Sequence, residues 1–168
     1  MKPKEGDFSD YYKLYIDLVE HDNHIAALGD NHERIVKFLK KLPKEKRDFR
    51  YDEGKWTPKE ILIHLLDAER VFAYRALRFS RGDETELPGY DHDNYVEPAQ
   101  VDKRKWKSLI KEYNAVRNAT LALFGNIPED ALDLGGVCSG ARQTVRAIGY
   151  IIAGHELHHM RVIQEKYL

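Results

Sequence analysis

Apolar residues recur at helical spacing over long segments of the chain, and this pattern predicts a set of helices. A first helix is expected from about residue 21 to residue 42, on the positions Ile25, Leu28, Ile35, Phe38, Leu39 and Leu42. Pro43 follows directly, and because proline has no backbone N–H for the next turn, it ends this helix. Residues 11–19, which come before it, fit either an extended arm or a short helix.

The second helix has the clearest start in the sequence. Thr57-Pro58-Lys59-Glu60 places a threonine at the N-cap, a proline at the first helical position and a glutamate at the third. The threonine hydroxyl and the glutamate carboxylate can accept from backbone N–H groups that lack a partner within the helix. An apolar stripe follows on Ile61, Leu65, Ala68, Phe72, Ala76 and Phe79. Gly82 then suits the C-terminal end.

Two further helices complete the pattern. One runs from about residue 102 to residue 124, with Trp106, Leu109, Tyr113, Val116 and Leu123 on its inner face. The last begins near Thr144 and continues almost to Leu168. Residues 83–100 and 129–143 are rich in proline, glycine and polar residues, so we expect long irregular connections there. No segment alternates apolar and polar residues, so we expect no sheet.

This pattern predicts an all-α fold, a four-helix bundle with long connecting loops. A chain of 168 residues with 42% hydrophobic content suits one domain over residues 1–168, with a short N-terminal arm at residues 1–20. No apolar run reaches the roughly 18 residues of a membrane helix, so we expect no membrane partner. The first residues contain no apolar segment typical of a signal peptide, and we expect a cytoplasmic protein.

Charge and cysteine content exclude several classes of function. Lys and Arg number 27 and Asp and Glu number 28, so the net charge is -1, which argues against a nucleic-acid partner. The single cysteine, Cys138, excludes an intrachain disulfide and a zinc site of several cysteines, and it is expected to be a small loop residue. The remaining candidate chemistry lies in eight histidines, three of them within His155-Glu-Leu-His158-His159.

Two of these histidines interrupt the apolar stripe of the last helix. Ile148, Ile152, His155, His159 and Val162 follow one another in steps of three and four residues. In a bundle this stripe faces the core, where an imidazole with unmet hydrogen bonds costs roughly 1–3 kcal/mol for each polar group. Histidines at i and i+4 lie one turn apart on one helix face, a spacing that suits chelation of one metal ion.

The second helix offers a third ligand. His64 lies inside the apolar run from Ile61 to Leu66, one turn from Ile61. Three histidines with an open fourth position are typical of a catalytic metal site, in which the ion lowers the pKa of a bound water or thiol. Asp67, three residues after His64, could orient a ligand imidazole, act as a base for the nucleophile, or simply pair with Arg70. We expect Asp67 to be catalytic.

Other histidines compete with this assignment. His158 shares a face with His155, and His32 lies between Leu28 and Ile35; His159 is preferred because it continues the stripe. The remaining three, His21, His24 and His92, are expected to be solvated. Residues 155–159 also match the zincin motif H-E-x-x-H, with Glu156 as the general base. The protease interpretation is weak, because no histidine follows residue 159 to act as the third ligand. Glu156 is expected to be a solvated or bundle-edge carboxylate, although it could still reach a metal-bound water.

At three segments the chain resembles the DinB/YfiT-like superfamily, a group unrelated to the DNA polymerase of similar name. They are GKWTPKEILIHLLDAER at residues 54–70, RVFAYRALRFSRGD at residues 70–83 and AIGYIIAGHELHH at residues 147–159. The resemblance implies a four-helix bundle, often a homodimer, that holds zinc or nickel on three histidines, which map to His64, His155 and His159. Some members of this superfamily are thiol-S-transferases or isomerases that use low-molecular-weight thiols such as bacillithiol or mycothiol, and others are metal-dependent hydrolases.

We therefore expect a metal-dependent enzyme that acts on a small-molecule substrate by thiol transfer or hydrolysis. A thiol cosubstrate would need a site for its carboxylates, and Arg75 or Arg78 could supply it. Residues of the 83–100 connection, such as Asp91, His92 and Tyr95, could shape the substrate pocket. The alternatives are a bundle in which the metal only joins two helices, and a dimeric stress or interaction protein without metal.

Overall fold

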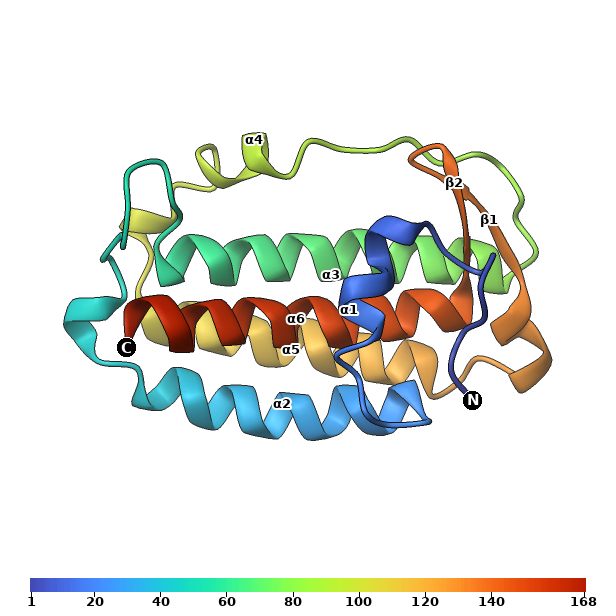
Figure 1. Cartoon of the computed structure of the whole chain (residues 1–168), viewed down its shortest axis with the longest axis horizontal. Helices are drawn as coiled ribbons and strands as arrows, with labels where there is room; N and C mark the ends of the chain where they lie inside the picture. Colours follow the sequence, from blue (N-terminus) through green and yellow to red (C-terminus); the bar gives the residue numbers. More distant parts are fainter.

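Four long helices lie side by side in the computed structural model, which describes residues 1–168 (Figure 1). They are α2 (His24–Lys41), α3 (Pro58–Ser80), α5 (Trp106–Phe124) and α6 (Val145–Tyr167). The predicted all-α four-helix bundle is confirmed. None of these helices is both long and apolar enough to cross a membrane.

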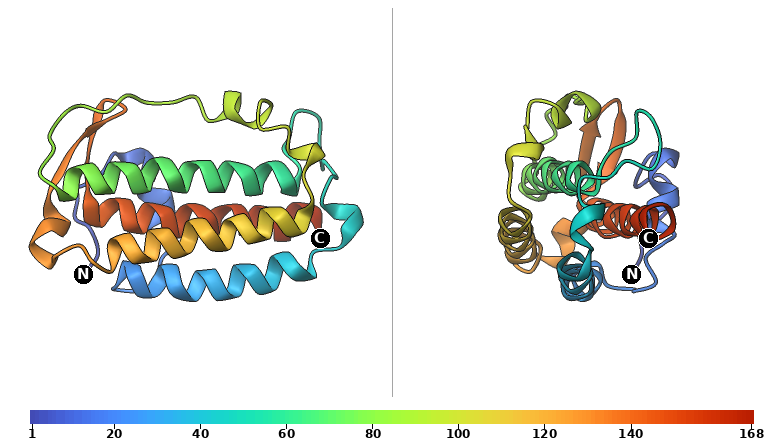
Figure 2. Two further views of the ribbon diagram at one scale, coloured as in Figure 1. Left: turned by 180° about the vertical axis from the view of Figure 1, so that it is seen from behind. Right: turned by 90° about the vertical axis from the view of Figure 1, so that its left-hand side faces the viewer.

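Each long helix packs against two of the others. α3 contacts α5 and α6, and α2 contacts the same two helices, so α2 and α3 lie on one diagonal of the bundle. The end-on view of Figure 2 shows this arrangement. Residues of α3 and α6 therefore face one another directly along their lengths.

Side-chain caps fix where the two helices that carry the predicted site begin. The Oγ1 atom of Thr57 accepts from the Glu60 N–H at 3.2 Å, and Oε2 of Glu60 accepts from the Thr57 N–H at 2.7 Å, which confirms the predicted capping box. At the start of α6, Oγ1 of Thr144 accepts from the Ala147 N–H at 3.2 Å. These caps fix the first turn of each of the two helices that carry the histidines.

The N-terminal arm is helical where it meets the bundle. A 3-10 turn, η1 (Asp10–Tyr12), leads into the short helix α1 (Lys13–Ile16), which packs against α6. Gly154 allows the close approach, because a Cβ atom there would lie 1.9 Å from the backbone oxygen of Tyr15. The contact places the Tyr15 ring 5.1 Å from the His155 ring, measured between centroids.

A two-stranded hairpin corrects the expectation of no sheet. β1 (Gly135–Cys138) pairs antiparallel with β2 (Ala141–Thr144). Strands of four residues are too short to show alternation, but the turn carries a signal that we missed. Ser139 and Gly140 both have positive φ, 54° and 76°, as the favoured two-residue hairpin turn requires. Cys138 is thus a buried strand residue and not a loop residue.

The hairpin holds one end of the long connection between α3 and α5. Leu87 donates its N–H to the Val137 carbonyl at 3.0 Å and accepts from the Ser139 N–H at 3.1 Å. From there the connection runs over α3 through the short helix α4 (Asp93–Val96) and the 3-10 turn η3 (Val101–Lys103) (Figure 1). Two further 3-10 turns, η2 (Lys44–Lys46) and η4 (Glu129–Asp133), lie in the other connections.

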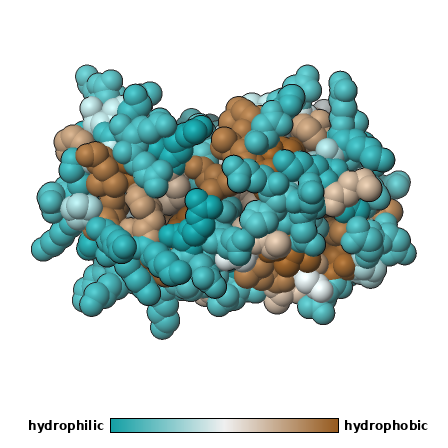
Figure 3. Space-filling model, turned by 60° about the horizontal axis from the view of Figure 1, so that its bottom comes forward, coloured by the Kyte–Doolittle hydropathy of each residue, from teal (hydrophilic) through white to brown (hydrophobic).

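A layer of buried polar residues divides the core into two apolar clusters. One cluster contains Leu28, Phe72 and Ile151, and the other contains Ile35, Leu62 and Ile163. Between them every long helix contributes a buried polar side chain, in chain order Asn31, Glu69, Arg117, His155 and Glu156. On the outside, Figure 3 shows a mostly hydrophilic face with separate apolar patches.

Candidate metal centre

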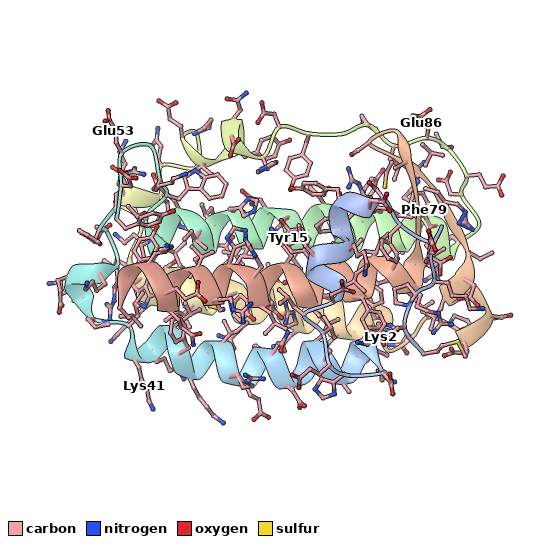
Figure 4. All side chains as sticks on the ribbon, viewed as in Figure 1. Lys2, Tyr15, Lys41, Glu53, Phe79 and Glu86 are labelled. Atoms are coloured by element: carbon pink, nitrogen blue, oxygen red, sulfur yellow. The ribbon has the colours of Figure 1, made fainter.

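The structure brings together the three histidines that the sequence singled out. Nε2 of His64 lies 3.0 Å from Nε2 of His155, and Nε2 of His159 lies 3.1 Å from the same atom. One ring nitrogen from each histidine lies within 4.8 Å of the others. The cluster forms where α3 faces α6, next to the point at which α1 brings Tyr15 onto α6 (Figure 4).

Hydrogen bonding alone does not account for this convergence. A neutral imidazole nitrogen offers either one N–H or one lone pair, yet Nε2 of His155 faces two ring nitrogens at once. A metal ion can take a lone pair from all three. With metal–nitrogen bonds of 2.0–2.1 Å, tetrahedral ligand atoms lie about 3.3 Å apart. The observed spacings of 3.0 and 3.1 Å are close to that value, so the residues fit a divalent metal ion.

Burial keeps the three imidazoles in the form that binds metal. Burial, with a smaller contribution from His92, lowers the pKa of His64 to about 4. Burial lowers the pKa of His159 to about 3, and the pKa of His155 lies well below its usual value for the same reason, with the neighbouring histidines adding to both shifts. All three side chains are therefore neutral at pH 7, and each has a lone pair to donate.

A cavity of about 270 Å³ opens beside the cluster. The three histidines form part of its wall, and most of the other lining side chains are aromatic: Tyr11, Tyr12, Tyr15, Trp56, Phe72 and Tyr90. The Trp56 ring lies 4.7 Å from the His64 ring between centroids. A small molecule can therefore approach the cluster from this side, in contact with aromatic rings.

Comparison with known proteins identifies the family. The model of the DinB superfamily matches residues 27–163. The chain belongs to the DinB superfamily. The resemblance that the sequence suggested is thus confirmed over most of the chain.

A solved structure shares the fold. It is that of YfiT from Bacillus subtilis, described as a probable metal-dependent hydrolase with an unusual four-helix bundle topology. The two chains are 17% identical and superpose with a TM-score of 0.75, over 98% of this chain and 90% of YfiT. At this identity the match shows the fold alone. No curated protein matches the chain.

The two competing histidines lie outside the cluster. His158 lines the cavity, but its ring packs edge-on against Tyr15 with 5.4 Å between centroids. Nε2 of His32 lies 2.8 Å from Oδ1 of Asn114, between α2 and α5. The apolar stripe of the last helix, followed in steps of three and four residues, therefore identified His159, the histidine that the structure places with His155.

The three histidines expected in solvent have different surroundings. His21 is solvent-exposed and pairs with Asp30 at 3.1 Å. His24 is buried against Phe124 and Tyr150, contrary to expectation, because it is the first residue of α2 and that turn already faces the core. His92 keeps partial exposure but lines the cavity, with its ring 5.3 Å from that of His64.

Asp67 lies apart from the histidines. Its Oδ1 accepts from Arg70 at 3.4 Å, and its side chain is 26% exposed. Burial raises the pKa of the Asp67 carboxyl, and Arg70 opposes that shift. It makes no hydrogen bond to a ring nitrogen and does not line the cavity. The catalytic role of Asp67 stays a prediction.

Glu156 is buried, which corrects its expected place at a solvated edge. Its carboxylate accepts from Arg117 at 2.7 and 2.8 Å and from the Tyr113 hydroxyl at 2.8 Å. Arg117 also donates two bonds of 2.8 Å to Glu69. The zincin-like glutamate therefore belongs to the buried polar layer and is directed toward α5. Charged residues at core-facing positions, such as Glu69 four residues after Leu65, were the signal for this network.

Proposed function

We propose that the chain is a metal-dependent enzyme in which His64, His155 and His159 hold one divalent transition-metal ion, zinc or nickel. The observation that carries the proposal is the convergence of three neutral imidazoles at the wall of an aromatic cavity. When bound, such an ion lowers the pKa of a coordinated water or thiol toward neutrality. The substrate is a small molecule that enters the cavity beside the ion.

The surrounding side chains fix the imidazoles. Trp56 packs against the His64 ring and Tyr15 packs edge-on against the His155 ring, and both contacts restrict rotation of the imidazoles. Hydrolysis is favoured because the structural relative YfiT is described as a probable metal-dependent hydrolase. Transfer from a low-molecular-weight thiol is the other reaction of this class that the resemblance implies.

Metal analysis of purified variants tests the ligand set. The wild-type protein should contain one transition-metal ion per chain, and alanine at His64, His155 or His159 should each remove it. The matched controls His158→Ala and His32→Ala should retain the ion, since both side chains lie outside the cluster. Loss of metal in His158→Ala with retention in His159→Ala, or a wild-type protein without transition metal, would contradict the proposal.

A non-catalytic role is the second candidate, because the cluster joins α3 to α6 and an ion there would tie the two helices together. Cobalt(II)-substituted protein separates the two roles. If a coordination position opens onto the cavity, azide should change the visible absorption of the cobalt. A spectrum that azide leaves unchanged would favour a purely structural ion.

The resemblance to the superfamily also leads us to propose a homodimer in the cytoplasm, without a nucleic-acid or membrane partner. Light scattering of the purified chain in solution tests the dimer. A monomer at all accessible concentrations would contradict it.

A further inference from the structure

Arg75 of α3 is a buried cation without an acidic partner. Its side chain and backbone together are 2% exposed. One nitrogen, Nη2, donates to the Pro88 carbonyl at 3.2 Å and to Oγ of Ser139 at 3.1 Å, and the guanidinium carbon lies 5.7 Å from the centre of the Phe72 ring. All these partners are neutral, so the positive charge of Arg75 is left without a counter-ion.

The other two buried arginines are neutralised. Arg117 pairs with Glu69 and Glu156, and Arg146 pairs with Glu129 and Asp133. A buried charge without a partner is costly to desolvate, and hydrogen bonds to a carbonyl and a hydroxyl offset that cost only in part. A fold that pairs its other buried arginines with carboxylates therefore keeps one cationic group free.

Two donors of Arg75, a residue at the wall of the metal-centre cavity, are left unused. Nε and Nη1 donate no hydrogen bond within the chain, and neither is sealed from solvent. Arg75 is itself one of the residues that line the cavity beside the three histidines. The guanidinium thus keeps N–H groups on Nε and Nη1 beside the space in which a small molecule would bind, and either nitrogen can donate a charge-assisted hydrogen bond to an oxyanion.

Arg75 and the histidines lie at different places along that cavity. Eleven residues separate His64 from Arg75, which is close to three helical turns, so both lie on one face of α3 with Cα atoms about 16 Å apart. Phe72 and the tyrosines line the wall as well. Pro88, from the connection over α3, and Ser139, from the hairpin turn, fix the guanidinium in place.

We propose that Arg75 anchors the oxyanion group, a carboxylate or a phosphate, of an elongated small molecule whose other end reaches the three histidines. Arg75 is then a specificity-determining residue. The assignment of the reacting end rests on the proposed function, whereas the anion site at Arg75 can be tested without it.

Calorimetric titration with matched probes tests the anion site. The probes are 4-phenylbutanoate, phenyl phosphate and the neutral 4-phenylbutanamide, added to the metal-loaded protein in a buffer without competing phosphate or carboxylate. At least one anion should bind tenfold or more tightly than the amide. The anion that binds more tightly then identifies the group, carboxylate or phosphate, that Arg75 recognises. Arg75→Met should abolish this preference. The control Arg78→Met should retain it, because Arg78 pairs with Asp83 and Tyr74 outside the cavity.

Two further measurements keep the result interpretable. Arg75→Met removes an unpaired buried charge, so it should fold with a melting temperature at or above that of the wild type. Arg75→Lys keeps the charge, but its single ammonium cannot bond to Pro88 and Ser139 and also extend a second nitrogen to the anion, so it should bind the anion at least several-fold more weakly. His64→Ala, which lacks a metal ligand, should retain anion binding. Equal affinity of the wild type for both anions and the amide, or undiminished anion binding in Arg75→Met, would overturn the proposal whatever the metal content.

Discussion

Without its metal ion the protein should lose stability as the pH falls, because burial holds the histidines of the cluster neutral. The pKa of His64 is lowered to about 4, against 6.5 for an ordinary histidine. As the pH falls below 6.5, the unfolded chain therefore takes up a proton at His64 before the folded chain does. The contribution of His64 to stability is fully present above pH 6.5 and is lost as the pH falls toward 4.

The size of the effect follows from that shift. Between pH 7 and pH 5, a pKa lowered from 6.5 to about 4 costs the folded state about 2 kcal/mol relative to the unfolded state. For a chain of this size, each kcal/mol corresponds to a change of roughly 2–4 °C in melting temperature. His64→Leu cannot take up this proton, so its melting temperature should fall by roughly 4–8 °C less than that of the wild type over the same pH interval.

Thermal unfolding of chelator-treated protein, followed by circular dichroism at pH 7, 6 and 5, measures this difference. His24→Leu is the matched comparison, because burial, with Arg146 adding to it, lowers the pKa of His24 to about 4 as well, at a place outside the cluster. His24→Leu should reduce the pH dependence of the chelator-treated protein by the same amount, and without chelator it should bind the metal as the wild type does. Identical pH dependence in wild type and His64→Leu would refute the idea that burial holds this imidazole neutral.

Two other substitutions test parts of the structure that surround the site. Gly154→Ala places a Cβ atom 1.9 Å from the Tyr15 carbonyl oxygen, so α1 must move away from α6; we expect a loss of about 1–3 kcal/mol in denaturant unfolding, and unchanged stability would contradict the close contact. Asp67→Asn should keep one metal ion per chain, since its carboxylate bonds to Arg70. If Asp67 is catalytic, turnover of a substrate falls sharply, and full activity would remove it from the mechanism.

The sequence predicted best the elements whose apolar pattern repeats over many residues. The four helices could be predicted because each repeats its apolar positions over at least five turns, and α3 adds a cap whose hydrogen bonds are encoded locally by Thr57 and Glu60. The three histidines could be predicted for the same reason, since polar residues in a regular apolar stripe stand out. The register of α3 against α6, which decides whether His64 meets His155, depends on packing between distant segments.

What the sequence did not reveal depends on contacts between segments far apart in the chain. The strands of the hairpin are four residues each, and they are stabilised by Leu87 of another connection as well as by their own pairing. Arg75 could be proposed from the sequence as an anion site only alongside Arg78. The structure separates them, because Asp83 neutralises Arg78 and no acid reaches Arg75.

The buried polar layer lies beside the histidine cluster, where its charge can strengthen the binding of a metal ion. Arg117 with Glu69 and Glu156 carries one positive and two negative charges. A cavity of about 10 Å³, the size of one water, is lined by Glu69, Glu156 and His155 among other residues. Three neutral imidazoles leave the charge of a divalent ion uncompensated, so a net negative layer behind His155 should strengthen its binding. Burial raises the pKa of Glu156 while Arg117 opposes that shift, which makes the charge of Glu156 depend on the pair.

Glu156→Gln removes the excess negative charge of this layer while keeping its shape and an oxygen for the Tyr113 hydroxyl. We expect the affinity for the metal ion, measured at pH 7 by competition with a chelator of known affinity, to fall roughly 10–100-fold, as it does when carboxylates behind metal ligands are replaced. Glu129→Gln is the control, because this exposed carboxylate pairs with Arg146 and lines neither cavity. If both variants bind the ion as tightly as the wild type, the layer serves only to join α3, α5 and α6.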